Sequence, residues 1–437
     1  MRPGDWRGTL AGHERLLMIS FSTVLVTAGQ GVIAPVLPLF QREFDVSAGV
    51  VGLTLSLFAL ARLVLNVPLG VLCDRRGRRL LLVGGPLVTA AGMVGTGLAQ
   101  EIGQLLAARA VAGAGSAMYM VASLTYLADI STEQNRARFI ATNQGALLLG
   151  VSIGPAVGGL LAEVYGFRLP FHVVGLAALV AAGYAYWRLP ETGASASRGP
   201  IHSGPAPESE WPGADRETGR QAAPVPLRGT AAGRRPWLAM LMSGNFLTVA
   251  FVTAMIFFTR AGGRQTIVPL LGDSRLGLST GFLGVVFTAM SLVNLVLIAP
   301  AAVAADRLGR RAVIVPSGIA TVAGLLLFAG ATNVALFLLG ALVLAVASAV
   351  AGPAPAAYVA DIAPAQARGL AMSFYRSAGD VGFVIGPPLL GVIADASSFG
   401  WALNANAVLV AIATILFLLV ARETMRPIRA ADAGGAG

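Results

Sequence analysis

Residues 63–79 read LVLNVPLGVLCDRRGRR, and residues 295–311, 232 positions later, read LVLIAPAAVAADRLGRR. In each copy an apolar run ends in an aspartate, and a cluster of arginines around one glycine follows. An apolar run needs roughly 20 residues to cross ~30 Å of hydrocarbon, and charged residues mark where it leaves the bilayer. The pair therefore predicts two membrane-spanning segments, each followed by a short basic turn.

Two further blocks repeat at the same offset. Residues 126–138 correspond to 358–370, and residues 153–163 correspond to 385–395. A constant offset over three separated blocks indicates that the chain consists of two similar halves. Because six spans would separate corresponding segments, the halves share one orientation and are related by an axis along the membrane normal. Two such halves can rock about a central site and expose it to each side in turn.

The composition places the whole chain in a membrane. Hydrophobic residues make up 56% of the 437 positions, charged residues make up 12%, and the mean hydropathy is +0.74. A soluble domain is about a quarter charged. We expect an all-α membrane protein with twelve transmembrane helices in two pseudo-symmetric six-helix bundles. The predicted spans are 16–39, 50–72, 80–99, 104–128, 138–162, 170–188, 238–261, 280–304, 312–331, 334–358, 369–393 and 402–421.

A long polar stretch divides the two halves. Residues 192–236 are rich in Gly, Pro, Ser and Ala and lack apolar periodicity, which is typical of a disordered linker. We therefore expect one bundle over 1–191, a cytoplasmic linker over 192–236, a second bundle over 237–425 and a cytoplasmic tail over 426–437.

All 31 basic residues are arginines, and the net charge is +10. The arginines lie mostly in short loops between apolar runs, which is typical of a topology signal and argues against nucleic-acid binding. With both termini in the cytoplasm, the opposite side would hold only Arg42, Arg168 and Arg275. Cytoplasmic loops carry the excess of positive residues. We therefore expect a multi-pass protein of the inner (plasma) membrane with both termini cytoplasmic.

The stretch GVLCDRRGRR at 70–79 resembles the signature loop between helices 2 and 3 of the major facilitator superfamily, and residues 302–311 resemble its degenerate copy between helices 8 and 9. The resemblance implies a twelve-helix transporter. Asp74 could meet arginines or the positive N-terminus of helix 11 when the cytoplasmic side is closed. Alternatively, the arginines only set the topology. The predicted gate comprises Gly70, Asp74, Arg75, Gly77, Arg78, Asp306 and Arg307.

RAVAGAGSA at 109–117 resembles an arginine-containing motif of the same superfamily. An unpaired charge inside an apolar helix costs at least ~2.5–3.5 kcal/mol on insertion scales. We expect Arg109 to face the central cavity with a partner or a water path; the alternative is an arginine that snorkels to the interface.

Asp380 is the only acid that the sequence places well inside a span, and Arg376 lies one turn earlier on the same helix face. Removal from water favours the neutral carboxyl group, whereas the arginine favours the charged one. A carboxyl group balanced in this way could load and release a proton. We expect Arg109, Asp380 and Arg376 to couple transport to protons, with a static ion pair between Asp380 and Arg376 as the alternative.

GVSIGPAVGG at 150–159 resembles the Gly-Pro motif of the drug:proton antiporters, and GFVIGPPLLG at 382–391 is its copy. The resemblance implies export. Pro155 removes one helical hydrogen bond, and the glycines leave a face that can pack closely against the other half. The alternative is a packing face with no bearing on direction. The motif residues are Gly150, Gly154, Pro155, Gly158 and Gly159.

Polar residues within the spans mark the expected substrate cavity. In the seventh span, Arg260 and Arg264 flank a Gly-Gly break and could hold an anionic or zwitterionic head group or snorkel. We expect Arg260 to face the cavity and Arg264 to lie at the outer interface. Helix 1 offers Gln30 but no acid, which argues against a substrate range restricted to cations. The predicted lining comprises Gln30, Arg62, Asn66, Asn143, Gln144, Arg260, Gln265 and Asn294.

These features predict a secondary active exporter of small amphipathic or lipophilic compounds, driven by proton antiport. We expect small-molecule substrates, protons and the lipid bilayer as partners and a monomer as the working unit. We expect no cofactor, no metal site, no nucleic-acid partner and no enzymatic activity, since no nucleotide-binding or catalytic motif is visible. The alternatives are a proton-coupled importer of a small metabolite and a receptor that binds a ligand without transport. Five arginines within the helices, at positions 62, 109, 260, 264 and 376, argue against the receptor, which needs no wet pathway.

Overall fold

A computed structural model describes residues 5–132, 135–192, 240–364 and 368–424 of the chain. The linker predicted over 192–236, apart from Thr192, and the tail predicted over 426–437 lie outside the described residues. Every regular element within the described ranges is a helix. Within these ranges the helices form twelve spans that are long and apolar enough to cross a membrane, so the predicted twelve-helix membrane protein is confirmed.

The N-terminal half contains six of these spans, the first of which consists of two helices in series. Its helices are α1 (Asp5–Gly31), α2 (Ile33–Glu43), α3 (Ala48–Arg76), α4 (Arg78–Leu98), α5 (Ile102–Ile130), α6 (Arg136–Tyr165) and α7 (Arg168–Arg188). The C-terminal half contains the other six. Its elements are α9 (Gly244–Phe258), η2 (Thr259–Ile267), α10 (Val268–Leu276), α11 (Thr280–Leu308), α12 (Arg310–Ala329), α13 (Val334–Ala351), α14 (Ala354–Ile362), α15 (Arg368–Ala396) and α16 (Phe399–Val420).

The turns after α3 and α11 depend on glycine. Gly77 has φ 93° and Gly309 has φ 102°, a region that side chains other than glycine rarely adopt. Each glycine reverses the chain within one residue, so that the next helix begins at Arg78 or Arg310. The two turns are 232 residues apart, like the sequence blocks that contain them.

The seventh span differs from its prediction. It continues to Leu276 rather than ending at residue 261, because the Gly-Gly segment forms the nine-residue π-helix η2 and the chain does not break there. Gly262 lies against α15, where an added Cβ would approach the carbonyl carbon of Gly386 at 2.6 Å. The prediction that Arg264 lies at the outer interface is therefore wrong, since the span continues for more than two turns beyond it.

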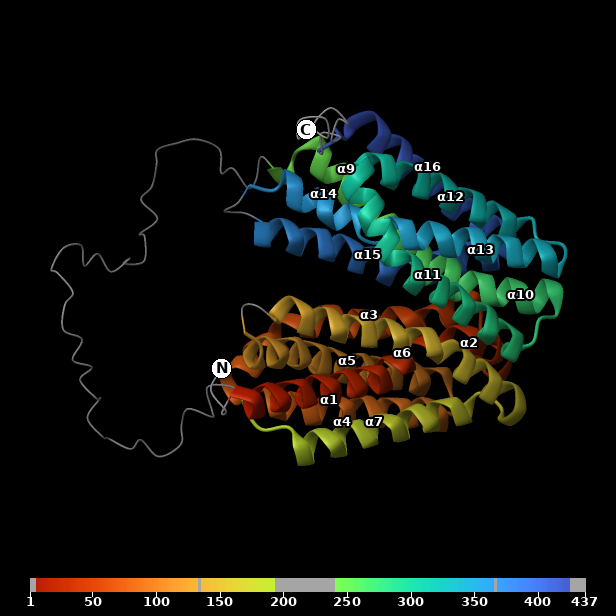
Figure 1. Cartoon of the computed structure of the whole chain (residues 1–437). Coiled ribbons are helices and arrows are strands. Elements are labelled where there is room, and N and C mark those ends of the chain that lie inside the picture. Colours follow the sequence, from red (N-terminus) through yellow and green to blue (C-terminus); the bar gives the residue numbers. More distant parts are fainter. Residues whose placement is uncertain (1–4, 133–134, 193–239, 365–367, 425–437) are drawn as a thin grey trace, which may run out of the picture.

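The two halves meet along two helix pairs, α6 with α11 and α3 with α15. In Figure 1 the ribbons of the halves lie close together near α2 and α10 and diverge toward the end where α1 begins. We call the first end, where α3 and α11 begin, the closed end. The opposite end, which holds residues 74–79 and 306–311, is the basic end.

Candidate functional site

Polar contacts join the halves at the closed end. The Ser56 hydroxyl donates to the Val384 carbonyl at 2.6 Å, which links α3 to α15. The backbone N–H of Ala156 donates to the Thr288 hydroxyl at 2.9 Å, which links α6 to α11. These donors and acceptors lie within the spans, where an unpaired polar group costs several kcal/mol. They stabilise a conformation in which this end is shut.

The glycines of the 150–159 motif pack on two neighbours. Added Cβ atoms at Gly150, Gly154 and Gly158 would meet the backbone of α1 and the residue that follows it, Val32. Gly159 and Pro155 face the other half, where Gly284 of α11 approaches both. The motif therefore allows α6 to touch two helices closely, one within its own half and one across the interface.

A cavity of about 310 Å³ lies between α6 and the C-terminal half, on the side of this contact that Gln144 and Asn294 line. Most of its wall comes from the C-terminal half, from α9, η2 and α11 to α16, and α6 contributes Gln144 and Leu148. Apolar side chains such as Val252, Ile256 and Phe257 alternate with polar ones. A mixed lining of this kind suits a compound with an apolar body and a few polar groups.

Two arginines of η2 line the cavity. Arg260 is exposed to it, whereas Arg264 is only 9% exposed and donates from Nη2 to the Ser291 hydroxyl at 2.9 Å. Both also line a smaller void of about 20 Å³ between the halves, together with Gln265. Of the residues predicted to line the cavity, Gln144, Arg260 and Asn294 line the main one, and Gln265 lines the small void.

The other predicted lining residues lie elsewhere. Asn143 is 1% exposed and accepts a hydrogen bond from the Thr23 hydroxyl at 2.7 Å, and Gln30 donates to the Ser116 hydroxyl at 3.3 Å. These two side chains link helices within the N-terminal half. Arg62 lies 6.0 Å from the centre of the Phe58 ring, and Asn66 is exposed near the basic end of α3.

Asp380 is partly buried near the middle of α15. Arg62 of the N-terminal half and Arg376 of its own helix both interact with it electrostatically. Within the described ranges neither arginine lies within 4.0 Å of its carboxylate oxygens. Asp380 thus feels the charge of two arginines, one from each half, without a closed ion pair.

Arg109 occupies a different environment. It is 1% exposed, its guanidinium lies 4.8 Å from the centre of the Phe58 ring, and Nη1 lies 3.7 Å from the Met93 sulfur. The cation is held by aromatic and thioether groups. The predicted position at the cavity is not found in this conformation, because α3 and α4 cover the side chain. Arg109 and Asp380 are not brought together.

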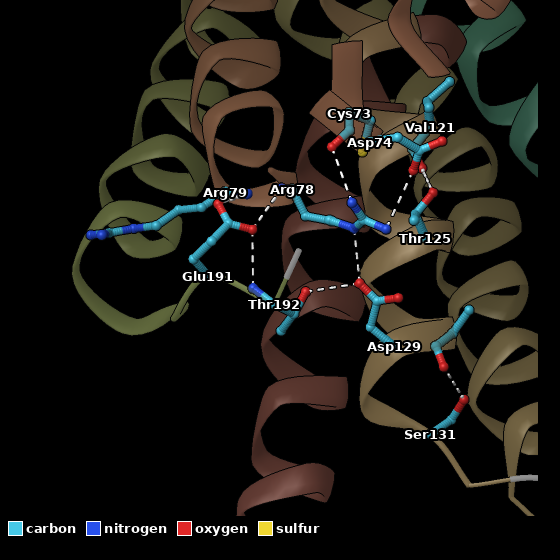
Figure 2. A network of polar contacts seen from close by, with 11 residues as sticks. Cys73, Asp74, Arg78, Arg79, Val121, Thr125, Asp129, Ser131, Glu191 and Thr192 are labelled. Atoms are coloured by element: carbon cyan, nitrogen blue, oxygen red, sulfur yellow. Dashed lines mark hydrogen bonds and ion pairs between the residues drawn. The ribbon is translucent and has the colours of Figure 1, made fainter. Parts of the chain in front are cut away.

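A polar network holds the basic end of the N-terminal half (Figure 2). The Arg78 side chain donates to Asp129 at 2.9 Å and to the Cys73 carbonyl at 3.1 Å, and it lies 3.3 Å from Asp74. The Glu191 carboxylate accepts the backbone N–H groups of Arg78 at 2.7 Å and Arg79 at 3.1 Å, the first residues of α4. The network therefore ties α3, α4, α5 and the segment after α7 together.

The same network recurs in the C-terminal half. Arg310 pairs with Asp306 and donates to Asp361 at 3.2 Å. Glu423 accepts the backbone N–H groups of Arg310 at 2.9 Å and Arg311 at 3.0 Å. Asp129, Asp361, Glu191 and Glu423 were not predicted from the sequence, although the spacing of 232 residues within each pair was a signal that could have found them.

The predicted gate residues lie apart from the other half in this conformation. Asp74 is 73% exposed and pairs with Arg78 of its own half, and Arg75 and Arg307 are also exposed. An added Cβ on Gly70 would meet no atom within 4 Å. The gate role therefore remains a prediction about a different conformation, in which the basic end is closed. In the described part of the chain no group of three His, Cys, Asp or Glu side chains could hold a metal.

Comparison with known proteins identifies the family. The sequence profile described as Major Facilitator Superfamily matches residues 19–271 and 254–436. Multidrug resistance protein 1 of Bacillus subtilis is 32% identical over 154 residues, which is 35% of this chain and 39% of that protein. The quinolone resistance protein NorA of Staphylococcus aureus is 25% identical over 169 residues, which is 39% of this chain and 43% of that protein. The matches thus span less than half the length of these relatives.

The fold has a solved counterpart. The crystal structure of a bacterial homolog to the human lysosomal transporter Spinster, in an inward-facing and unoccupied conformation, matches with a TM-score of 0.74. The sequence identity is 15%, and the match covers 94% of this chain and 97% of that one. At this identity the likeness concerns the fold alone.

Proposed function

The chain belongs to the Major Facilitator Superfamily, and we propose that it exports small amphipathic or lipophilic compounds in exchange for protons. It is a multi-pass membrane transporter rather than an enzyme. The observation that carries the proposal is the cavity of about 310 Å³ beside the interface of the two halves, with its mixed apolar and polar wall. A monomer contains both halves and the whole cavity, so it suffices for the cycle.

The orientation in the plasma membrane decides which side of the membrane this conformation is open to. We place the arginine-rich loops in the cytoplasm. The basic end is then the cytoplasmic end, and the halves are parted on that side and joined on the outer one. Compounds from the cytoplasm or the inner leaflet would enter the cavity in this state. Closure of the basic end, with Asp74 meeting the other half, and opening of the outer end would release them outside.

Asp380 is the proposed proton carrier. Arg376 lies one turn away on the same helix, and Arg62 acts on Asp380 from the other half, so rocking of the halves changes the distance to Arg62 alone. When Arg62 approaches, the charged carboxylate is favoured and the proton leaves. When Arg62 moves away, removal from water favours the neutral form and the group takes up a proton. Arg109 would act from the neighbouring α5 once α3 moves.

The Gly-Pro face of α6 supports export. It forms the interface with α11 at Gly159 and Gly284, and so lies where the outer end must open. The relative from Bacillus subtilis is named a multidrug resistance protein, which agrees with export of diverse compounds.

Transport into proteoliposomes tests this function. The purified protein is reconstituted with a trapped pH dye, and cationic, neutral and anionic amphiphiles are added to wild type, Asp380→Asn and the control Asp45→Asn. Asp45 is exposed and lies at the closed end, away from the cavity. Proton movement opposite to substrate flux, lost only in Asp380→Asn, is the expected result. Proton movement in the same direction as the substrate would make the protein an importer, and binding without flux would make it a receptor.

A further inference from the structure

We infer that the cavity binds an anionic amphiphile, whose head group lies between Arg260 and Arg264 and whose apolar body fills the cavity. This inference names the substrate class and rests on the proposed function. It is argued from the charged side chains that line the site.

Arg264 is a buried cation with no carboxylate within 4.0 Å among the described residues. It is 9% exposed, and its Nη2 donates to the neutral Ser291 hydroxyl at 2.9 Å. Its Nε is buried and has no hydrogen-bond partner among the described residues. A charge that is removed from water and met only by a neutral group is costly, and a bound anion would offset that cost.

The neighbouring charges make the same site more positive. Arg260, one turn earlier in η2, acts electrostatically on Arg264, and Arg62 of the other half acts on Arg260. In the described residues none of these three arginines has a carboxylate within 4.0 Å. Asp380 is the acid that acts on Arg62, and since Arg376 also acts on Asp380, one negative charge stands against four positive ones. The arginines around this site therefore repel one another.

An anion relieves this repulsion and a cation increases it. The planar guanidinium group donates two parallel hydrogen bonds to a carboxylate, a phosphate or a sulfonate. Arg264 keeps an unused Nε–H, and Arg260 is exposed to the cavity. Next to them the wall carries Ile256, Phe257 and Ile298, which can cover an apolar body. The site therefore fits a compound with an acidic head and an apolar tail.

A matched set of fluorescent probes tests the charge preference. Dansyl-labelled undecanoic acid, its primary amide and the corresponding trimethylammonium compound share the fluorophore and the chain and differ in head group. Binding to the full-length protein in phosphatidylcholine nanodiscs is measured by fluorescence. We expect the carboxylate to bind on the order of tenfold more tightly than either of the others. Equal affinities, or tighter binding of the cation, would overturn the inference.

Variants locate the preference. Arg264→Gln should abolish it, Arg264→Lys should retain part of it because the charge remains, and Arg188→Gln should leave it unchanged. Arg188 is exposed at the end of α7, a helix that contributes no residue to the cavity wall, and it serves as the matched control. A preference that survives in both Arg264→Gln and Arg260→Gln would also overturn the inference. Circular dichroism and gel filtration confirm that each variant is folded before its affinity is compared.

A displacement experiment with lipids identifies the source of the anion. Displacement of the probe by phosphatidylglycerol, and not by phosphatidylcholine, would identify a membrane lipid as the occupant, whereas no displacement would identify a soluble amphiphile. Both results retain the anion site. Because binding is measured without flux, a charge preference with no transport would refute the proposed function alone. Transport without a charge preference would refute this inference alone.

Discussion

The carboxylate of Asp395, at the end of α15, accepts a hydrogen bond from the backbone N–H of Gly49, at the start of α3 in the other half, at 2.9 Å. Its second oxygen accepts the N–H of Ala48 at 2.8 Å. A carboxylate at a helix N-terminus satisfies free donors and interacts favourably with the helix dipole. Glu163, 232 residues earlier, lies against Gly281 at the start of α11. Each half thus covers the beginning of a helix in the other.

We predict that Asp395→Ala weakens the closed end. The variant loses two hydrogen bonds to a charged acceptor, so the conformation described above should be destabilised by on the order of 1–2 kcal/mol relative to the one open at this end. Spin labels at Val164 and Trp401, which are exposed near this end of each half, would give longer distances in electron–electron double resonance measurements. Asp45→Asn, at the same end, is the control. Unchanged distances in Asp395→Ala would contradict the prediction.

We predict that Glu191→Ala and Glu423→Ala lower thermal stability to a similar extent. Each carboxylate accepts two backbone N–H groups at a helix start, so each loss should cost about 1–2 kcal/mol. Because the two sites lie in different halves, the double variant should show the sum of the two effects. Thermal melting of the purified protein in detergent measures this. The Gln variants should lose less, since the amide oxygen still accepts; equal losses for Gln and Ala would rule out the capping role.

We predict that Asp74 and Asp129 differ although both contact Arg78. Asp129→Asn should destabilise the protein, since it leaves a guanidinium that is only 13% exposed with a weaker partner. Asp74→Asn should change stability by less than about 0.5 kcal/mol, because Asp74 is 73% exposed. If Asp74 meets the other half when the basic end closes, its variant should nevertheless transport several-fold more slowly. Melting and proteoliposome flux are measured on the same preparations, and normal flux in Asp74→Asn would remove the gate role.

We predict that Gly159→Leu prevents the closed end from shutting. An added side chain would meet the Thr280 carbonyl and Gly284 across the interface. Transport should fall at least about tenfold, which corresponds to ~1.4 kcal/mol of bias between the two states. Gly183→Leu is the control, because an added Cβ there would meet no atom within 4 Å. Full transport by Gly159→Leu would show that this close contact is not required in the cycle.

The fold could be predicted from the sequence because it depends mainly on the hydropathy and charge of individual segments. Apolar spans of about 20 residues, basic turns and a repeat at a constant offset can all be read directly from the sequence. An apolar segment of this length forms a helix in a bilayer, because its backbone polar groups must pair with one another there. The seventh span was predicted too short, since a Gly-Gly pair normally indicates a break. Here α15 and α16 pack against Gly262 and Gly263 and keep the chain helical as η2.

The candidate site could be predicted only in part. The types of residue were visible, since arginines and a single mid-span aspartate stand out in apolar helices. Their partners were not. Asn143 and Gln144 are adjacent in the sequence, yet the first is enclosed within the N-terminal half and the second lines the cavity. One step along a helix turns a side chain by about 100°, so neighbouring residues can face different helices.

The sequence alone therefore determined that this is a twelve-span membrane protein of two related halves, because hydropathy, charge placement and repetition are properties of the chain itself. Only the tertiary structure decided that Asp395 covers the start of α3, that Arg62 of the other half acts on Asp380, and that Arg264 is buried at the cavity. These contacts join residues up to hundreds of positions apart. They depend on which faces the helices turn toward one another, and that orientation is set by packing of the whole bundle.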